Sequence, residues 1–358
     1  MNAKLLLGAC APLLLAAAAL PDEDEIVFRP ARDTRLTKTI EYSKELVLEE
    51  SLYIENDEQE VLEQFEENYG EEFRVTFTDH FASVRGSRPL RLLRTYDAME
   101  GRSFYDFSDA NYPGEDSESV SDFQSVMEGE TVQFTWDVQG EAYVAELVES
   151  QADGEWLEGL SDHHVEDLAF RFFLPGEAVA VGHRWKVDYE PLSRLLLDLE
   201  FEYHFVSDED YGYFEDLEDY EDYGAGLPRA RADQPPGDIV VERNGEVDAR
   251  YAGVREEDGR RLAVIEVKAK LDDLFSWNDV DEYGQPVKTT FEKDFELEGE
   301  VLWDLEGGYL HGLLLEGKTS DRDSSVTNDE YDGEEYVMEY RDHYAGTVRL
   351  AVEVSRGE

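Results

Sequence analysis

Apolar and polar residues alternate with a period of two along most of the chain, and this pattern limits the fold more than any other feature. Side chains of an extended strand point alternately to opposite faces of a sheet, so each alternating segment predicts a strand with one buried face. Sequences such as Val138-Gln139-Gly140 and Glu256-Glu257-Asp258-Gly259 separate the segments, as in hairpins between antiparallel strands. The alternating positions are Leu36, Lys38, Ile40 and Tyr42; Leu46, Leu48, Leu52 and Ile54; Phe73, Val75, Phe77 and Phe81; Val132, Phe134 and Trp136; Tyr143, Ala145 and Leu147; Val247, Ala249 and Tyr251; Leu262, Val264 and Glu266, or their neighbours Ile265 and Val267; those between Leu297 and Leu315; and Val348, Leu350 and Val352. The sequence therefore predicts an antiparallel meander.

Helical spacing of apolar residues is rare in this chain and predicts three helices. The first begins after Asn56 or Asp57 and ends at Gly70, the second covers residues 162–173, and the third begins at Pro191. The apolar positions of the first are Val61, Leu62, Phe65 and Tyr69, and those of the third are Leu192, Leu195, Leu196 and Leu199. The predicted fold class is therefore mainly β (α+β), with a few packed helices.

Acidic residues dominate the charge of the chain. There are 87 Asp and Glu against 32 Lys and Arg, a formal net charge of −55. Nucleic-acid phosphates are bound by clustered cations, so this charge excludes a nucleic-acid binder and disfavours an anionic membrane surface. The hydrophobic share of 41%, with 12% aromatic residues, is nevertheless enough for a sizeable core.

The N-terminal residues predict export. Lys4 is followed by an apolar run from Leu5 to Leu20, too short to span a bilayer, and Ala16–Ala19 supplies the small residues of a cleavage site. We expect residues 1–19 to be a signal peptide and the protein to be periplasmic or extracellular. Leu7-Gly8-Ala9-Cys10 leaves open a second interpretation, a lipoprotein anchored through Cys10. No later stretch is long and apolar enough for a transmembrane helix.

The single cysteine limits the chemistry of the mature chain. Cleavage of the leader removes Cys10, and the mature chain then has no cysteine. Thiol catalysis, disulfides and zinc-thiolate sites are therefore excluded for the mature chain. A nucleophile elbow of the Gly-x-Ser-x-Gly type and a phosphate-binding glycine loop are also missing from the sequence. Whether the chain is an enzyme stays open, because 87 acidic residues place many carboxylate pairs at catalytic distance by chance.

One acidic stretch interrupts the β-rich pattern. Residues 207–237 are a low-complexity run of Asp, Glu and Tyr followed by prolines, which predicts a solvated insertion. Residues 20–206 and 238–358 then form one β-rich domain. Trp136-Asp137-Val138-Gln139-Gly140 and Trp303-Asp304-Leu305-Glu306-Gly307 share the pattern Trp-Asp-x-x-Gly, which leaves open that this domain consists of two similar halves.

A segment in the middle of the chain carries a family resemblance. Leu174-Pro175-Gly176 and the following Val179-Ala180-Val181-Gly182-His183-Arg184-Trp185 resemble a segment of uncharacterised exported proteins of planctomycete-type bacteria. The hairpin at residues 245–267 and the turn at residues 299–308 resemble later parts of the same proteins. Those proteins are similar in outline to lipoprotein-carrier half barrels of the LolA/LppX type. The resemblance implies a curved antiparallel sheet or half barrel whose covering helices enclose an apolar cavity, and it implies no catalytic residues.

This expected cavity gives the functional prediction. Its predicted lining is Val61, Phe65, Phe134, Trp136, Leu192, Leu196 and Trp303. The chain would then be a non-catalytic binder of an apolar small molecule or lipid. The alternatives are a partner-binding or structural cell-envelope module, whose partner is a protein, and a carboxylate-dependent hydrolase. An all-apolar lining would favour carriage, and convergent polar groups with perturbed pKa values would favour catalysis.

One segment has the spacing of a calcium loop. Asn328, Glu330, Asp332 and Glu339 present side-chain oxygens around Gly333, in the order expected for a calcium ligand set with a closing glutamate. Asn at the first position and Glu at the third depart from that pattern. A polar hairpin loop is the alternative interpretation, and the sequence predicts no other cofactor.

Overall fold

The computed structural model describes residues 23–55, 58–61, 65–109, 117–125, 127–148, 168–202, 205–207, 240–280, 286–331 and 334–357. The strands of the first half are β1 (Glu23–Asp24), β2 (Arg35–Glu55), β3 (Glu58–Val61), β4 (Phe65–Arg85), β5 (Arg88–Asp109), β6 (Ser117–Ser125), β7 (Thr131–Asp137) and β8 (Ala142–Leu147). Then follow a 3₁₀ turn (Arg171–Phe173), β9 (Val179–Ala180), β10 (Arg184–Val187), helix α2 (Glu190–Glu202) and β11 (Phe205–Ser207). The second half contains β12 (Val240–Glu257), β13 (Arg260–Val280), β14 (Pro286–Asp304), β15 (Tyr309–Tyr331) and β16 (Glu334–Arg356).

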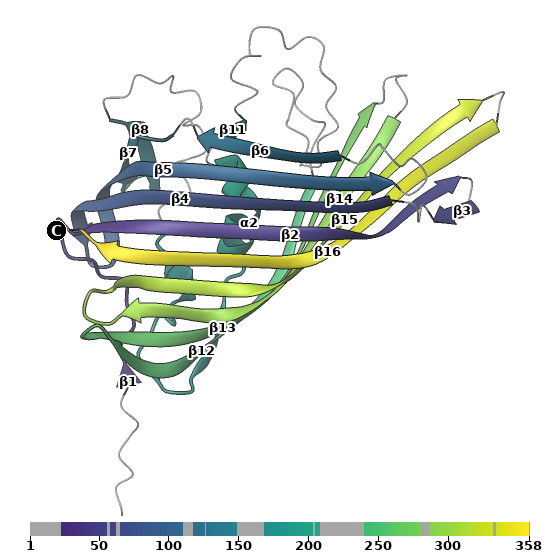
Figure 1. Ribbon diagram of the computed structural model, residues 1–358. Coiled ribbons are helices and arrows are strands. Elements are labelled where there is room, and N and C mark those ends of the chain that lie inside the picture. The colour runs from purple at the N-terminus through teal and green to yellow at the C-terminus, as the bar shows by residue number, and fades with distance from the viewer. Residues whose placement is uncertain are drawn as a thin grey trace, which may run out of the picture.

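Antiparallel pairing joins fourteen of the strands within the described ranges into one sheet. Its order is β10-β12-β13-β14-β15-β16-β2-β4-β5-β6-β11, with β3 beside β2 and β7 and β8 beyond β5. The strands β12 to β16 form a continuous meander, and β16 pairs with β2, so the first long strand and the last strand lie side by side in the middle of the sheet (Figure 1). The mainly β fold class predicted from the alternation is confirmed. In the part of the chain that the structure describes, no helix is long and apolar enough to cross a membrane.

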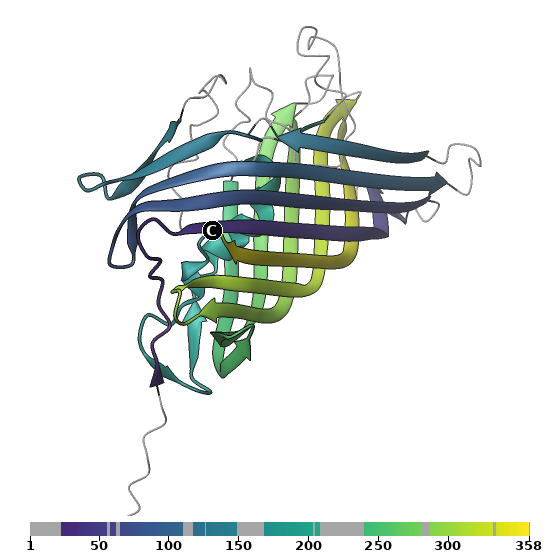
Figure 2. The same cartoon turned by 60° about the vertical axis from the view of Figure 1, so that its left-hand side comes forward.

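The sheet is strongly curved, and three glycines lie where its long strands bend. Gly299, Gly317 and Gly346 occupy adjacent strands β14, β15 and β16. A Cβ atom at any of them would collide with a backbone carbonyl of the neighbouring strand. Only glycine allows this close approach, so the three residues permit the bend that Figures 1 and 2 show in these strands.

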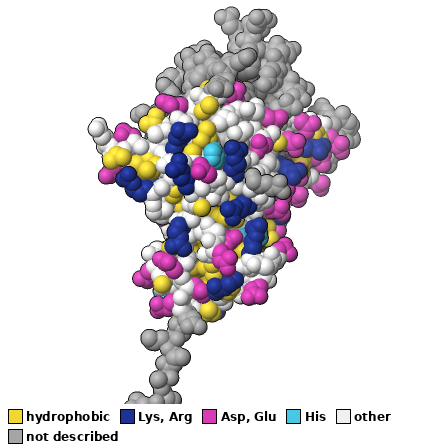
Figure 3. Space-filling model, turned by 90° about the vertical axis from the view of Figure 1, so that its left-hand side faces the viewer, with side chains coloured by type: hydrophobic (Ala, Val, Ile, Leu, Met, Phe, Trp, Pro, Cys, Tyr) yellow, Lys and Arg dark blue, Asp and Glu magenta, His cyan; other side chains and the backbone are white. Residues whose placement is uncertain are grey.

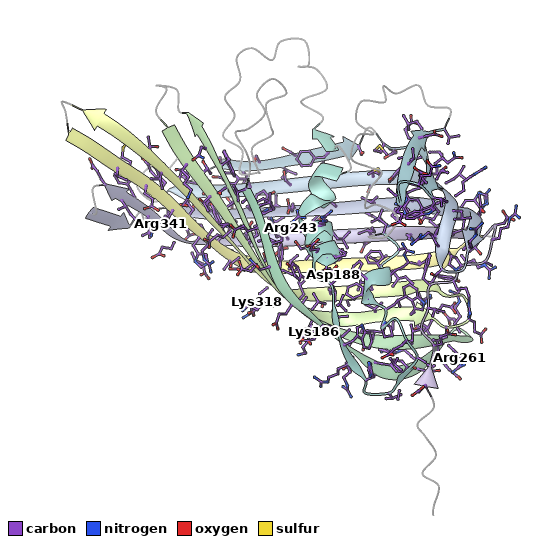
Figure 4. The ribbon with its side chains drawn as sticks, turned by 180° about the vertical axis from the view of Figure 1, so that it is seen from behind. Lys186, Asp188, Arg243, Arg261, Lys318 and Arg341 are labelled. Carbon is purple, nitrogen blue, oxygen red and sulfur yellow. The ribbon has the colours of Figure 1, made fainter. Side chains whose placement is uncertain are left out.

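The hydrophobic core lies on the concave face of the sheet. The alternating residues of β2 and β4, such as Ile40 and Phe77, are buried there. Helix α2 lies across this face in the view from behind (Figure 4), with Leu192, Leu195 and Leu196 in the same core cluster. The helix begins as expected for Pro at its first turn, and the prediction of a helix at residue 191 is confirmed.

The other predicted helices have different outcomes. The helix after Asn56 is wrong, because residues 58–61 form β3 and residues 65–69 belong to β4. Of the helix at 162–173, only residues 168–173 are described, and they form a turn followed by the 3₁₀ turn. The signal peptide and the acidic insertion lie outside the described residues, except that Ser207 ends β11.

Candidate functional site

On β15 the concave face of the sheet changes from apolar to polar at the bend, whereas β13 and β14 keep Phe275 and Phe291 on this face. On β15 the inward positions are Leu313 and Leu315 before Gly317, and then Thr319, Asp321 and Asp323. Thr319 and Asp321 are buried like the leucines, so the strand keeps its inward face and changes only the chemistry of that face. In Figure 4, Lys318 lies at the bend and Arg341 lies on the arm beyond it.

A buried lysine connects three strands at the start of the polar half. The Nζ atom of Lys44 on β2 lies 3.0 Å from Oε1 of Glu71 on β4 and 3.4 Å from Oδ2 of Asp321 on β15. The Tyr69 hydroxyl donates a 2.8 Å hydrogen bond to Oε2 of Glu71, and its ring centroid lies 5.6 Å from Lys44 Nζ. Burial opposes the charge of Lys44, but the carboxylates of Asp321 and Glu71 outweigh it and raise the pKa of Lys44 well above its ordinary value.

Three oxygen atoms on one face of β15 have no hydrogen-bond partner among the described residues. They are Oγ1 of Thr319, Oδ1 of Asp321 and Oδ1 of Asp323, and all three atoms are buried. The residues follow one another at i, i+2 and i+4 and form a continuous row of oxygen atoms, which we call the acceptor wall. All three atoms can accept hydrogen bonds, and the Thr319 hydroxyl can also donate one. Burial, followed by the nearby charge of Asp321, raises the pKa of Asp323 to about 7. The wall therefore changes its charge near neutral pH.

Further titratable groups surround the acceptor wall. The hydroxyl of Tyr344, which is paired in register with Asp321, donates a 3.0 Å hydrogen bond to Oε1 of Glu67. Burial raises the pKa of both Tyr344 and Glu67. Asp342 lies on the same face of β16 and accepts a 2.6 Å hydrogen bond from Ser51 Oγ. These groups extend the polar surface over β2, β4, β15 and β16.

A second charged cluster lies within the apolar half. Asp79 on β4 accepts hydrogen bonds from Nε and Nη2 of Arg94 at 2.7 and 3.0 Å and from Nζ of Lys38 at 2.8 Å. Lys38 also donates to the carbonyl oxygen of Leu168 at 2.7 Å. All three charged side chains are buried, and the Phe77 ring lies under both cations. Both oxygens of Asp79 are thus bonded, as expected for a structural ion cluster.

The outer face of the same arm has a depression of about 440 Å³. Charged residues from four strands line it, including Glu292, Arg322, Arg341 and His343. Asp323 and Asp342, which have the inward parity, also border it. Its arginines are already paired: Arg341 bonds Glu339 at 2.6 and 2.9 Å, and Arg322 bonds Glu292 at 3.2 Å. The arginines of the depression are therefore paired, whereas the three oxygens of the inner face have no hydrogen-bond partner among the described residues.

Four of the seven residues predicted to line an apolar cavity are buried parts of the packed core. Phe134, Leu192, Leu196 and Trp303 are buried in one contiguous cluster. The Trp303 indole Nε1 donates a 3.0 Å hydrogen bond to the carbonyl of Val27. Trp136 is only partly buried, and the Arg88 guanidinium lies 3.9 Å from its ring centroid. Val61 ends β3 and Phe65 begins β4, and their side chains are not described.

The predicted calcium ligands lie on the arms of the last hairpin. Asn328 and Glu330 belong to β15, and Glu339 lies in β16 opposite Val326. Asp332 lies outside the described residues. The register runs straight along both arms, and the carboxylate of Glu339 bonds Arg341. Within the described residues there is no group of three or more His, Cys, Asp or Glu placed to hold a metal ion.

The two Trp-Asp-x-x-Gly segments form the same local structure. Each aspartate ends a strand and accepts two backbone N–H groups of the following turn: Asp137 from Gln139 and Gly140, and Asp304 from Glu306 and Gly307. The motif is therefore a hairpin turn stabilised by its own aspartate.

Basic residues gather at the opposite end of the molecule. Arg85 and Arg88 border the hairpin between β4 and β5, and Arg91 lies nearby on β5. These three side chains are exposed, whereas Arg94 points inward to Asp79. Figure 3 faces this end and shows Lys and Arg side chains among acidic and apolar ones. The arginine run is thus divided between the surface and the core.

The acceptor wall could not be found from apolar periodicity. Thr319, Asp321 and Asp323 continue the inward parity of Leu313 and Leu315, but their polarity ends the apolar signal at Leu315. The same occurs on β4, where Tyr69 and Glu71 precede the apolar positions. A usable signal would be an alternating segment in which the inward positions change from apolar to polar well before the next turn residues. Such a segment would indicate a long strand with a polar inward face.

Comparisons with known proteins add little. No protein-family model matches the chain, and no curated protein matches it either. Among solved structures, the outer membrane protease OmpT from Escherichia coli matches at 6% identity and a TM-score of 0.18, covering 92% of this chain and 99% of that one. The β domain of the Bordetella autotransporter BrkA matches at 9% identity and a TM-score of 0.15, covering 89% and 99%. TM-scores this low carry no argument about fold or function.

Proposed function

We propose that the chain is an exported binding protein without catalytic activity, and that its ligand lies on the concave face of the sheet against Thr319, Asp321 and Asp323. Export is supported by the N-terminal apolar run. The ligand position is supported by one observation, the three buried oxygens that have no hydrogen-bond partner among the described residues.

Buried oxygens without hydrogen-bond donors destabilise the folded protein. A buried acceptor without a donor costs about 1–3 kcal/mol, and native proteins contain few of them. Three such atoms in one row on one strand form a local concentration of this cost. A ligand that donates hydrogen bonds to the row would remove the cost, so the arrangement favours binding there.

An apolar ligand remains a prediction for the other half of the concave face. Leu192 and Leu196 are packed into the core cluster, so such a ligand requires α2 to move away from the sheet. A lipid or acyl chain would have to displace these contacts. We place the ligand in the polar half because its oxygens lack partners, and since these oxygens are buried, the side chains over them must shift to admit it.

Two tryptophan substitutions on adjacent residues test this position. Ser325 follows Asp323 on the inward face of β15, and Ser324 points to the outer face. We expect Ser325→Trp to abolish saturable thermal stabilisation by a small molecule and Ser324→Trp to keep it. The panel would contain an alkyl ammonium, a neutral sugar, a carboxylate and a fatty acid. Loss of binding in Ser324→Trp alone would move the site to the outer depression, and no stabilisation by any compound would contradict a binding function.

A hydrolase is the second candidate, because Asp321 and Asp323 have different environments. Asp321 contacts Lys44, whereas burial raises the pKa of Asp323 to about 7, as for a general acid. Two residues apart on one strand face, they are separated by about 7 Å between Cα atoms. Release of a chromogenic leaving group from aryl glycosides, lost in Asp323→Asn, would favour this candidate over a pure binder.

A further inference from the structure

The acceptor wall is unusual in what it lacks. Thr319 is 3% exposed, and its hydroxyl has no partner among the described residues. Asp321 is 6% exposed, and one of its two oxygens is bonded while the other is not. An ionised carboxylate can only accept hydrogen bonds, so the unbonded oxygens of Asp321 and ionised Asp323 need donors from other groups.

The charges that face the wall favour a cation. From the strands packed around Asp323, the acidic groups are Asp321, Asp342, Glu71 and Glu67, and the basic groups are Lys44 and Lys293. Lys44 is already shared between Glu71 and Asp321. Ionised Asp323 therefore adds negative charge to a surface that already carries more acidic than basic groups.

The protein itself binds one ammonium group on this surface. Lys44 Nζ lies between the carboxylates of Glu71 and Asp321 and near the Tyr69 ring. This is the environment that an alkyl ammonium prefers, with anionic acceptors and an aromatic face. Lys44 uses Oδ2 of Asp321, so Oδ1 of the same carboxylate remains for a second ammonium group.

The same oxygens are poorly suited to a metal ion. Metal ligands converge on one point, whereas the wall extends along a strand for about 13 Å between the Cα atoms of Thr319 and Asp323. Within the described residues there is no metal-holding group of His, Cys, Asp or Glu. A row of separate acceptors suits an extended ligand with several N–H donors.

We propose that Thr319, Asp321 and Asp323 bind the primary ammonium groups of a linear organic amine. This inference rests on the proposed function and names its ligand class. The ligand donates to Oδ1 of Asp321 and Oδ1 of Asp323, and Thr319 Oγ1 accepts a further N–H at the end nearest the bend.

Calorimetric titration with spermidine at pH 8 in 0.5 M NaCl tests the proposal, because ~0.5 M salt screens the exposed charges of the surface. We expect one saturable site, weakened at least tenfold by Asp321→Asn and by Asp323→Asn. Asp272→Asn is the matched control, since Asp272 lies exposed on the outer face of β13 and its change removes the same charge. We expect the affinity of Asp272→Asn for spermidine to stay within twofold of that of the wild type. Equal weakening in all three variants would show counterion condensation and overturn the proposal.

A third variant, Thr319→Val, completes the test, because neither a lost charge nor misfolding can explain a weaker binding of spermidine in it. Thr319→Val keeps the shape of the side chain, removes an unbonded hydroxyl and should leave the melting temperature unchanged or higher. We expect it to weaken spermidine binding three- to tenfold, and unchanged binding would contradict a role for Thr319. Tetramethylammonium, which has no N–H donor, should not compete. If Ser325→Trp abolishes binding of a sugar or a carboxylate while spermidine never binds, the proposed function stands and the amine inference fails.

Discussion

Two buried lysines on one strand have opposite surroundings. Lys38 and Lys44 both point inward from β2, six residues apart, and each touches a carboxylate. Burial, followed by the charge of Arg94, lowers the pKa of Lys38 even though Asp79 opposes this effect. For Lys44, two carboxylates overcome burial and raise the pKa.

The difference lies in the balance between donors and acceptors. Around Lys38, two cations share Asp79, and both of its oxygens are bonded. Around Lys44, one cation forms ion pairs with Glu71 and Asp321, Lys293 acts on Glu71 and Asp323 through its charge, and the wall still has unbonded acceptors. The first cluster is complete within the described chain, and the second needs a donor. A charged cluster in a core is therefore structural or ligand-binding according to which of its atoms are left without partners.

Removing the shared carboxylate of the complete cluster should have the largest effect. Asp79→Asn leaves Arg94 and Lys38 buried without a counter-charge, which costs about 3–5 kcal/mol of unfolding free energy. Urea denaturation at pH 7 measures the loss. Asp97→Asn, on the exposed face, should cost less than about 1 kcal/mol. A loss of unfolding free energy below about 1 kcal/mol in Asp79→Asn would show that the cluster does not stabilise the fold.

Lys44→Met should cause the next largest loss of unfolding free energy, and this loss should depend on pH. With Lys44 present, burial tends to raise the pKa of Glu71, but Lys44 outweighs it and the pKa is lowered. Without Lys44, burial would raise this pKa above its unfolded value, so stability would fall as pH rises. We expect a loss of about 2–3 kcal/mol at pH 8 and less than about 1 kcal/mol at pH 5. A loss independent of pH would mean that packing, not charge, is what Lys44 provides.

Part of this comparison can be predicted from the sequence. The alternation already places Lys38 on the inward face with Leu36 and Ile40. Its partner Asp79 is 41 residues away on another strand, and pairing over that distance depends on register, which a single sequence does not give.

The polar half was missed for a physical reason. Strand prediction relies on apolar inward positions, and Tyr69, Glu71 and Asp321 break that pattern because their face carries polar chemistry. The residues Val61 and Phe65 then fitted a helical spacing, although they belong to β3 and β4. Strand prediction from apolar periodicity was thus wrong in the part of the sequence where the candidate site begins.

Asp323→Asn should stabilise the protein. The pKa of Asp323 is about 7 in the folded state, above the unfolded value of about 3.9, so the folded state holds the proton longer and stability is lost as pH rises from about 4 to 7. Asparagine has no such dependence. We expect the variant to gain about 1–3 kcal/mol at pH 8 and nothing at pH 4, measured by urea denaturation at both values. A less stable variant at pH 8 would show that ionised Asp323 already has a donor.

Lys38→Met should have the smallest effect and sharpens the comparison with Lys44→Met. Arg94 still bonds both oxygens of Asp79, and removal of Lys38 relieves its desolvation. Loss of the hydrogen bond to the Leu168 carbonyl opposes this relief, so we expect a net change below about 1 kcal/mol. Equal losses in the two Lys→Met variants, measured side by side at pH 8, would remove the distinction between the clusters.

A crystal structure of the mature protein with spermidine at pH 8 tests most directly whether the acceptor wall waits for a donor. We predict an ammonium nitrogen within about 3 Å of Asp321 Oδ1, a second one near Asp323 Oδ1, and Lys44 unmoved between Glu71 and Asp321. The claim would be contradicted if both wall oxygens were bonded to donors of the chain itself and spermidine were bound elsewhere.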